Sequence, residues 1–281
     1  RMLKRLWIVP GYAAFGTWYS LTSNSNGYRI RNIDGIEPVK ADINTTNNAS
    51  MNGIHINSAY QRSRNIVVTI GLYPGNGKTL EDLRKQLYLN APVGLSTRLS
   101  FDLDEGGKYR LIKAVVESNE MNRFSKDPEQ VISFICPDPY FTSSVETTYP
   151  VHGSDLTTGY VVPYSGTAEA GFNFWFMLDS DIKAGGYFQV TNKAPYGQSN
   201  TQRLSFATDV KVNAGQNAIA INSVPGDRRI IVHTSSWLKA LDNNHTWPML
   251  RPGDNTLKLD TKTSSLAYNA QVTFTERYGE L

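Results

Sequence analysis

The chain has 281 residues, of which 40% are hydrophobic and 19% are charged, and its formal net charge is +3 at pH 7. This length suits two domains that each bury their own core, and the scattered lysines and arginines exclude the basic footprint of a nucleic-acid-binding protein. The single cysteine excludes an internal disulfide framework, and no apolar run reaches the ~18 residues of a membrane span.

That cysteine, Cys136, lies in the apolar run VISFICPDPYF, where a buried and unreactive thiol is the expected state. The N-terminus carries no secretory signal pattern. We therefore expect a protein that is assembled in a reducing cytoplasm, with no membrane insertion and no nucleic acid binding.

The run RNIVVTI at 64–70 is typical of a buried strand, and the loop GLYPGNGKTLEDL that follows it raises the question of a nucleotide-binding P-loop. A P-loop requires a glycine five positions before Gly77, where this chain has Leu72. Pro74 also removes one of the N–H groups that would wrap a phosphate. The segment instead predicts a strand-to-helix loop, with Thr79 as the N-cap of the helix.

The clearest helix pattern is TLEDLRKQLYL at 79–89. Leu80, Leu83 and Leu87 recur at i, i+3 and i+7, so one face of this helix is expected to pack on a sheet. The repeated strand and helix alternation of a nucleotide-binding α/β fold is absent. We expect no cofactor.

The next pattern has a period of two. The run LSTRLSFDLD at 95–104 alternates apolar and polar residues, and EGGK then turns the chain into YRLIKAVVES, so the two runs predict a hairpin. Asp102 and Asp104 lie on the polar face of this strand. Their spacing allows a glycosidase-like carboxylate pair, but such residues are usually solvent-facing, and we favour that interpretation.

A domain boundary is predicted near residue 141, where CPDPYF ends an apolar strand with two prolines. The following TSSVETTYPVHGSDLTTG at 142–159 is polar and has no clear period, which is typical of a linker or of the entry into a new domain. The predicted domains are 1–141 and 142–281, with the last strand free to return to the first domain. The many short strand patterns of the second domain favour a sandwich or jelly roll, with a weak helical turn near SSWLKALDN.

The segment GFNFWFMLD at 171–179 carries one suggestive pattern. Its phenylalanines share one face, which leaves Trp175 and Met177 on the other. Trp175 is a candidate platform for a sugar ring, but two large apolar residues together more often mark a protein contact, which we favour. Trp237 and Trp247, which flank His245, are weaker candidates of the same kind.

No catalytic or metal-binding constellation is recognisable. The four histidines have no partner at i, i+2 or i, i+4, and no Gly-x-Ser-x-Gly elbow is present. The sequence therefore predicts neither a metal site nor an enzyme.

Four blocks in the first half of the chain carry a family resemblance. They are YRIRNIDGIEPVKADINTT (28–46), RNIVVTIGLYP (64–74), TLEDLRKQLY (79–88) and GKYRLIKAVVESNEMNRFSKDPEQVISFICPDPYF (107–141). In order and spacing they resemble the N-terminal domain of the distal tail protein family of long, non-contractile-tailed bacteriophages. In the second half only LRPGDNTLKLD and AQVTFTERY are similar to this family. The segment 90–93 departs from it, because it lacks the usual aromatic residue and Pro-Lys pair.

The resemblance implies a mainly β protein with one α-helix in the N-terminal domain. That domain is expected to be a β-sandwich or split-barrel-like ring domain, followed by a galectin-like or jelly-roll β-sandwich. The implied function is a structural hub: a six-fold ring with the tail tube protein on one face and the tail-tip hub or tail-associated lysin protein on the other. Receptor-binding or side-fibre proteins would attach to the C-terminal domains. The implied location is the virion tail tip, after assembly in the bacterial host cytoplasm.

The polar arm from Ala41 to Tyr60 is the candidate oligomer or tail contact, because such a segment can pair with a neighbouring subunit. Its candidate contact residues are Asn44, Thr45, Asn52, Ile54 and Ile56. Two alternatives to the hub remain. The second hypothesis is a carbohydrate-binding module, either as a stand-alone lectin or as an added activity of the C-terminal domain, and the third is a hydrolase of a cell-wall polymer.

Overall fold

Two structural units make up the chain in this computed structural model, which describes residues 3–11, 18–22, 26–47, 53–105, 108–121, 128–193, 199–212, 217–264 and 267–281. For residues 104 and 105 only the backbone is described. Unit 1 comprises Arg1–Ser144 and Tyr278–Leu281, and unit 2 comprises Val145–Arg277. The chain therefore leaves unit 1 once and returns to it after unit 2 is complete.

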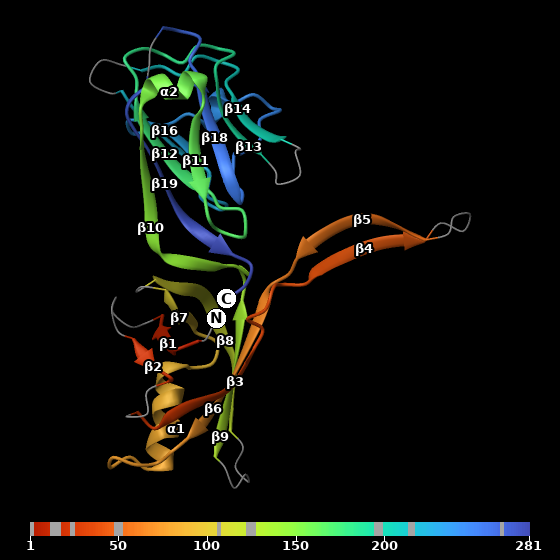
Figure 1. Cartoon of the computed structure of the whole chain (residues 1–281), viewed down its shortest axis with the longest axis vertical. Helices are drawn as coiled ribbons and strands as arrows, with labels where there is room; N and C mark the ends of the chain where they lie inside the picture. The colour runs from red at the N-terminus through yellow and green to blue at the C-terminus, as the bar shows by residue number, and fades with distance from the viewer. Residues whose placement is uncertain are drawn as a thin grey trace. The chain divides into compact units, whose positions relative to one another are not determined.

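Unit 1 contains an antiparallel sheet in the strand order β2-β1-β7-β8-β9-β6-β3 (Figure 1). Its strands are β1 (Arg5–Pro10), β2 (Tyr19–Ser20), β3 (Tyr28–Asp34), β6 (Arg64–Leu72), β7 (Ser96–Glu105), β8 (Lys108–Met121) and β9 (Glu129–Cys136). The first residues of β10 (Phe141–Val151) also pair with β8. Because side chains alternate along each strand, one face of the sheet collects the apolar residues of the core.

Helix α1 (Leu80–Asn90) packs on this core, as the sequence predicted. The Thr79 hydroxyl accepts a hydrogen bond from the Asp82 N–H, and the Asp82 carboxylate accepts one from the Thr79 N–H at 2.9 Å. This capping box satisfies two N–H groups that the helix leaves free, and its hydrogen bonds hold the pKa of Asp82 below the usual value. Leu83 and Leu87 are fully buried in the core of unit 1.

The predicted hairpin at 95–118 is confirmed as β7 and β8, with two differences in burial. Leu95 precedes β7 and is exposed, although its pattern assigned it to the core face. Ser100 belongs to the polar face but is completely buried, because large side chains on that face cover it. The polar face of this sheet is therefore only partly exposed to solvent.

Unit 2 is a β-sandwich of two antiparallel sheets, in the orders β17-β16-β15-β12-β19-β10 and β11-β18-β13-β14. Its remaining elements are β11 (Tyr160–Tyr164), β12 (Phe172–Met177), β13 (Tyr187–Lys193), β14 (Ser199–Ser205), β15 (Ala218–Asn222), β16 (Arg229–Val232), β17 (Ser235–Ser236), β18 (Gly253–Asp260), β19 (Tyr268–Tyr278), helix α2 (Gly153–Thr158) and the 3-10 turn η2 (Leu238–Ala240). Phe174 and Phe188 come from different sheets and stack at 4.8 Å between ring centres. The mainly β fold of the prediction is confirmed.

The predicted linker at 142–159 is wrong. Strand β10 runs through most of this segment to Val151, and α2 follows it. The stretch contains five threonines and two valines, which favour strands. The alternation of apolar and polar residues that marks a strand is not visible in this segment. The reason is that β10 is an outer strand of its sheet in unit 2, where the consecutive residues from Ser144 to Glu146 are all exposed. None of the helices in the described part of the chain has the length and apolar character to span a bilayer.

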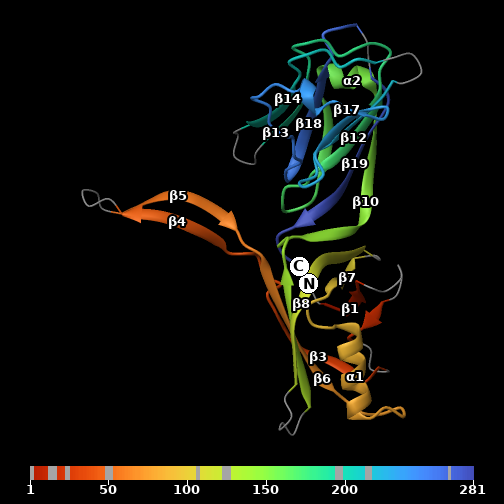
Figure 2. The ribbon, with the colours of Figure 1, turned by 180° about the vertical axis from the view of Figure 1, so that it is seen from behind.

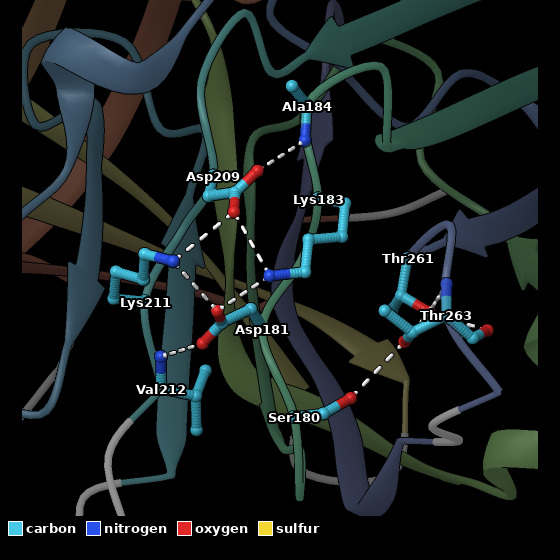
Figure 3. Close-up of polar contacts among 9 residues, drawn as sticks. All are labelled: Ser180, Asp181, Lys183, Ala184, Asp209, Lys211, Val212, Thr261 and Thr263. Atoms are coloured by element: carbon cyan, nitrogen blue, oxygen red, sulfur yellow. Dashed lines mark hydrogen bonds and ion pairs between the residues drawn. The ribbon is translucent and has the colours of Figure 1, made fainter.

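Four charged side chains form a closed ring between two loops of unit 2 (Figure 3). The Nζ atoms of Lys183 and Lys211 each lie 3.0–3.2 Å from carboxylate oxygens of both Asp181 and Asp209. The other oxygen of each carboxylate accepts a backbone N–H: Asp181 from Val212 and Asp209 from Ala184, both at 2.9 Å. These backbone hydrogen bonds and the two lysines lower the pKa of each carboxyl to about 2.

This ring of two aspartates and two lysines is expected to stabilise unit 2 in an acid-sensitive way. In the unfolded chain the two carboxyls titrate near their ordinary pKa of 3.8, so the unfolded state takes up protons first as the pH falls. The stabilisation is complete above the unfolded-state pKa of 3.8, and it is lost as the pH falls from 3.8 to about 2. Urea unfolding of the parent and of the isosteric variant Asp181→Asn/Asp209→Asn, in steps from pH 6 to pH 2, measures it. Equal pH slopes for the two proteins would contradict the assignment.

Candidate interaction surface

Strands β4 (Ala41–Asn47) and β5 (Ile54–Gln61) of unit 1 form a separate two-stranded sheet. The residues of these two strands are exposed except Asp42, which is half-buried. Figures 1 and 2 both draw it as a ribbon that leaves the other strands of unit 1. An isolated two-stranded hairpin is marginally stable in water, so this ribbon is suited to pairing with another surface.

The register of the hairpin contains one irregularity, which decides how its faces are composed. Asn44 pairs with Ser58, but the next residue, Thr45, pairs with Ile56, so Asn57 is an extra residue on β5. The Asn57 side chain accepts a hydrogen bond from the Thr46 hydroxyl at 3.2 Å and therefore points to the face of Thr46. This β-bulge shifts the alternation of β5 by one residue.

As a result, the isoleucines of the hairpin gather on one face, which we call the isoleucine face. Ile43 pairs with Ala59, Thr45 with Ile56, and Asn47 with Ile54, and cross-strand partners share a face. Ile43, Ile54 and Ile56 are 52%, 62% and 57% exposed. The isoleucine face carries no charged side chain, so it is an apolar strip open to solvent.

The opposite face is polar. It carries Asp42, Asn44, Thr46, His55, Ser58 and Tyr60. Arg62 forms an ion pair with Asp42, and the hydrogen bonds that its guanidinium donates to Tyr60 and Asp42 raise the pKa of Arg62. The hairpin is thus amphipathic across its two faces.

The root of the hairpin is fixed by the buried side chain of Arg64, the first residue of β6. Its guanidinium donates hydrogen bonds to four main-chain carbonyl oxygens, at 2.5–2.8 Å. Their residues are Gly35, Glu37, Pro139 and Gly279. The guanidinium also lies over the Phe141 ring, at 4.6 Å, and burial lowers the pKa of Arg64. One side chain thereby joins the strand that enters the hairpin, the start of β10 and the returning C-terminal segment.

The close packing at this root requires a glycine. Gly35 has a φ of +84°, which side-chain-bearing residues rarely adopt. A Cβ at Gly35 would also lie 1.9 Å from the carbonyl oxygen of Asn65. The backbone turn at Gly35 therefore brings its carbonyl within reach of Arg64.

The structure brings together some of the predicted contact residues and separates others. Thr45, Ile54 and Ile56 lie on the isoleucine face, whereas Asn44 lies on the polar face. Asn52 lies outside the described residues. Ile43 was missed by the sequence analysis, although its place between polar residues of a strand is a signal that could have found it.

Comparison with known proteins identifies part of unit 1. Residues 15–136 match the family model of the phage tail protein RIFT-related domain. This segment, which is less than half of the chain, is therefore similar to a phage tail RIFT-related domain. No curated protein sequence matches the chain.

The fold of the whole chain is also known from a solved structure. The crystal structure of the SPP1 Dit (gp 19.1) protein, described as a paradigm of the hub adsorption apparatus in phages that infect Gram-positive bacteria, is similar with a TM-score of 0.63 and 17% identity. The match covers 98% of this chain and 99% of that chain. The RIFT-related domain and this shared fold confirm the family resemblance that the sequence blocks indicated.

Two structures of the phage P2 baseplate in its activated conformation, one with Ca and one with Sr, are more distant. Their TM-scores are 0.43 and 0.44, at 9% and 10% identity. The match covers all of both chains for the first structure and 99% of both for the second. Similarity at this level carries no further conclusion about the present chain.

The glycine-rich loop of the RIFT-related domain is a tight turn. Gly75 and Lys78 exchange both backbone hydrogen bonds, at 3.0 and 3.2 Å. Asn76 and Gly77 between them both have positive φ, as a two-residue hairpin turn requires. The N–H groups of Gly75 and Lys78 are therefore already bonded within the turn, and the Thr79 hydroxyl caps α1.

The other residues considered in the sequence are not grouped into a reactive site. Cys136 is buried, and burial raises its pKa to about 12, so its thiol stays protonated at neutral pH. Asp102 is half-buried on β7, and the Asp104 side chain lies outside the described residues. Within the described ranges no three histidine, cysteine or acidic side chains are placed to bind a metal ion.

Trp175 lies on the outer face of unit 2, as strand alternation predicted. Phe174 and Phe176 are fully buried, whereas Trp175 and Met177 are half-buried. The cross-strand neighbours of Trp175 are Ala220 and Gln271, so neither cross-strand partner is a large apolar side chain. Trp237 and Trp247 instead pack against the sandwich core.

Changing Trp175 to alanine is expected to lower the free energy of unfolding of unit 2 by less than about 1 kcal/mol, because the ring lies outside the core. If Trp175 contacts a partner protein, as we favour, the same change weakens that association by about 2 kcal/mol or more. Thermal unfolding and binding of the full chain to isolated tail proteins measure the two effects. Glycan-array binding that disappears in Trp175→Ala would contradict the protein-contact role.

Proposed function

We propose that this chain is a structural hub protein of a bacteriophage tail: a ring of identical subunits that joins the tail tube to the tail-tip apparatus for host recognition. The observation that carries the proposal is the exposed isoleucine face of a hairpin inside the RIFT-related domain. A large apolar strip on an otherwise polar ribbon is a surface for protein association. The fold shared with SPP1 Dit supports the same role.

The hairpin suits a head-to-tail ring. In such a ring each subunit offers one surface to the next subunit and accepts the same surface of the previous subunit elsewhere. The hairpin emerges between β3 and β6, at one end of the strand order, so β2 at the other end is not involved in its root. The proposed ring is six-fold and is formed by the N-terminal unit.

The remaining partners follow from this arrangement as parts of the proposal. One face of the ring would stack on the tail tube protein, and the other on the tail-tip hub or tail-associated lysin protein. Unit 2, with its galectin-like or jelly-roll sandwich, would carry receptor-binding or side-fibre proteins. The ring would be assembled in the bacterial host cytoplasm, would reside in the virion tail, and would have no enzymatic activity.

A carbohydrate-binding role of unit 2 is the second candidate. It is favoured by the half-exposed indole of Trp175 on the outer sandwich face. The neighbours Ala220 and Gln271 offer few groups that would read sugar hydroxyls, so the hub proposal ranks first.

Measurement of the mass in solution tests the hub proposal. Light scattering or native mass spectrometry of the purified chain is expected to show a species of six times 31.3 kDa, in equilibrium with smaller species. Electron microscopy should then show closed rings. A chain that stays monomeric up to millimolar concentration and does not associate with any tail protein would contradict the proposal.

A further inference from the structure

A cavity of about 340 Å³ opens on the face of the unit 1 sheet that lies opposite the core. It is lined by Trp7 from β1, Trp18, which precedes β2, Ser100 from β7 and Tyr109 from β8. We call it the aromatic pocket. Its volume lies at the lower end of the range of small-molecule sites, which are typically lined by aromatic rings with a few polar groups.

The three rings meet at steep angles. Trp7 and Trp18 have their ring centres 6.3 Å apart with 75° between the ring planes, and Trp7 and Tyr109 are 5.4 Å apart at 89°. The aromatic rings therefore form adjoining walls of the pocket and are not stacked on one another. Trp18 is 46% exposed and forms the open rim of the pocket.

Ser100 supplies a second, independent observation. Its side chain is fully buried, and its Oγ has no hydrogen-bond partner among the described residues. A buried hydroxyl without a partner costs free energy, and such groups are uncommon in native proteins. A ligand with a hydroxyl group would satisfy this atom.

Polar side chains lie on both sides of Ser100 along the same strand face. Arg98 and Asp102 precede and follow it by two residues, so each is about 7 Å away along β7. Both are half-buried. The aromatic walls of the pocket are thus combined with one hydroxyl group, and charged residues flank Ser100 on the same strand face.

We propose that the aromatic pocket binds a neutral pyranose ring. The apolar C–H face of such a ring stacks on an indole, and an edge hydroxyl can pair with the Ser100 hydroxyl. An apolar side chain from another protein would leave the Ser100 hydroxyl unpaired. The site is separate from the isoleucine face and goes beyond the hub function.

The test uses the full chain and three probes: the methyl glycosides of glucose, galactose and N-acetylglucosamine. Tryptophan fluorescence and saturation-transfer NMR are expected to show saturable binding of at least one probe. Trp18→Ala should abolish this binding, and because Trp18 is at the rim the fold should persist. Ser100→Ala should weaken binding up to about tenfold without lowering the melting temperature, because it removes a hydroxyl that is unpaired in the free protein. Val161→Ala, at an exposed position on β11 of unit 2, is the control and should bind like the parent.

Failure to bind any of the three glycosides would overturn the proposal, as would binding that survives Trp18→Ala. In another outcome, the parent protein binds no sugar and the Trp18→Ala variant no longer assembles into a ring of subunits in solution. That result would assign the pocket to a protein contact instead. The ring itself is tested through the isoleucine face, so failure of the sugar site leaves the hub proposal intact.

Discussion

Replacing Arg64 by alanine is expected to lower the free energy of unfolding of unit 1 by about 3–5 kcal/mol, the usual cost of breaking a buried charged network. Four carbonyl oxygens lose their donor at once, and each buried acceptor without a partner carries its own penalty. Because domains are stable by only about 5–15 kcal/mol, unit 1 should be near its limit of stability. Urea unfolding followed by tryptophan fluorescence measures the change.

The matched control is Arg62→Ala, two residues earlier in the chain. The Arg62 side chain is 69% exposed and forms a surface ion pair with Asp42, so its loss should change the free energy of unfolding far less than the loss of Arg64. Arg64→Lys should be intermediate, because an ammonium keeps the charge but lacks the planar fork. Arg64→Ala would contradict the assigned role if it cost no more than Arg62→Ala.

The double variant Ile54→Asp/Ile56→Asp is expected to abolish ring formation and to leave a folded subunit. Both side chains are more than half exposed in the free subunit, so their replacement costs the fold little. In the ring each isoleucine would be buried, at about 1.5–3 kcal/mol for a complete side chain. The two together weaken each subunit contact by about 3–6 kcal/mol, or about 10²–10⁴-fold in affinity.

The control variant His55→Asp/Ser58→Asp adds the same two charges to the polar face of the same strand. It should form rings as the parent does, and circular dichroism should show that both variants are folded. Light scattering over a concentration series compares them. Equal assembly of the two double variants would mean that the isoleucine face does not carry the ring contact.

Local patterns allowed several elements to be predicted from the sequence. The period of Leu83 and Leu87 and the capping residue Thr79 marked α1, because helix caps and helix faces are determined by residues a few positions apart. The exposure of Trp175 on the outer face followed from alternation along a single strand. The glycine-rich loop was assigned to a turn because Leu72 and Pro74 are incompatible with a phosphate-binding nest.

Features that depend on pairing between distant residues were not predictable. The bulge at Asn57 changes which residues of β5 share a face. No residue type in that strand indicates a bulge, so the sequence did not predict that Ile43 and Ile56 lie on the same face. Arg64 reads as an ordinary surface arginine in the sequence, since one of its carbonyl partners lies 215 positions away. The aromatic pocket likewise combines three separate strands with Trp18.

The return of the chain to unit 1 has a consequence for the order of events during translation. Gly279 accepts a hydrogen bond from Arg64, and the Tyr278 ring lies 3.3 Å from the Arg110 guanidinium, yet both residues are synthesised after the whole of unit 2. A nascent chain that has emerged only as far as residue 144 lacks these contacts. The root of the hairpin is therefore completed only when the ribosome has finished unit 2, which would delay closure of the proposed ring until each subunit carries both of its folded parts.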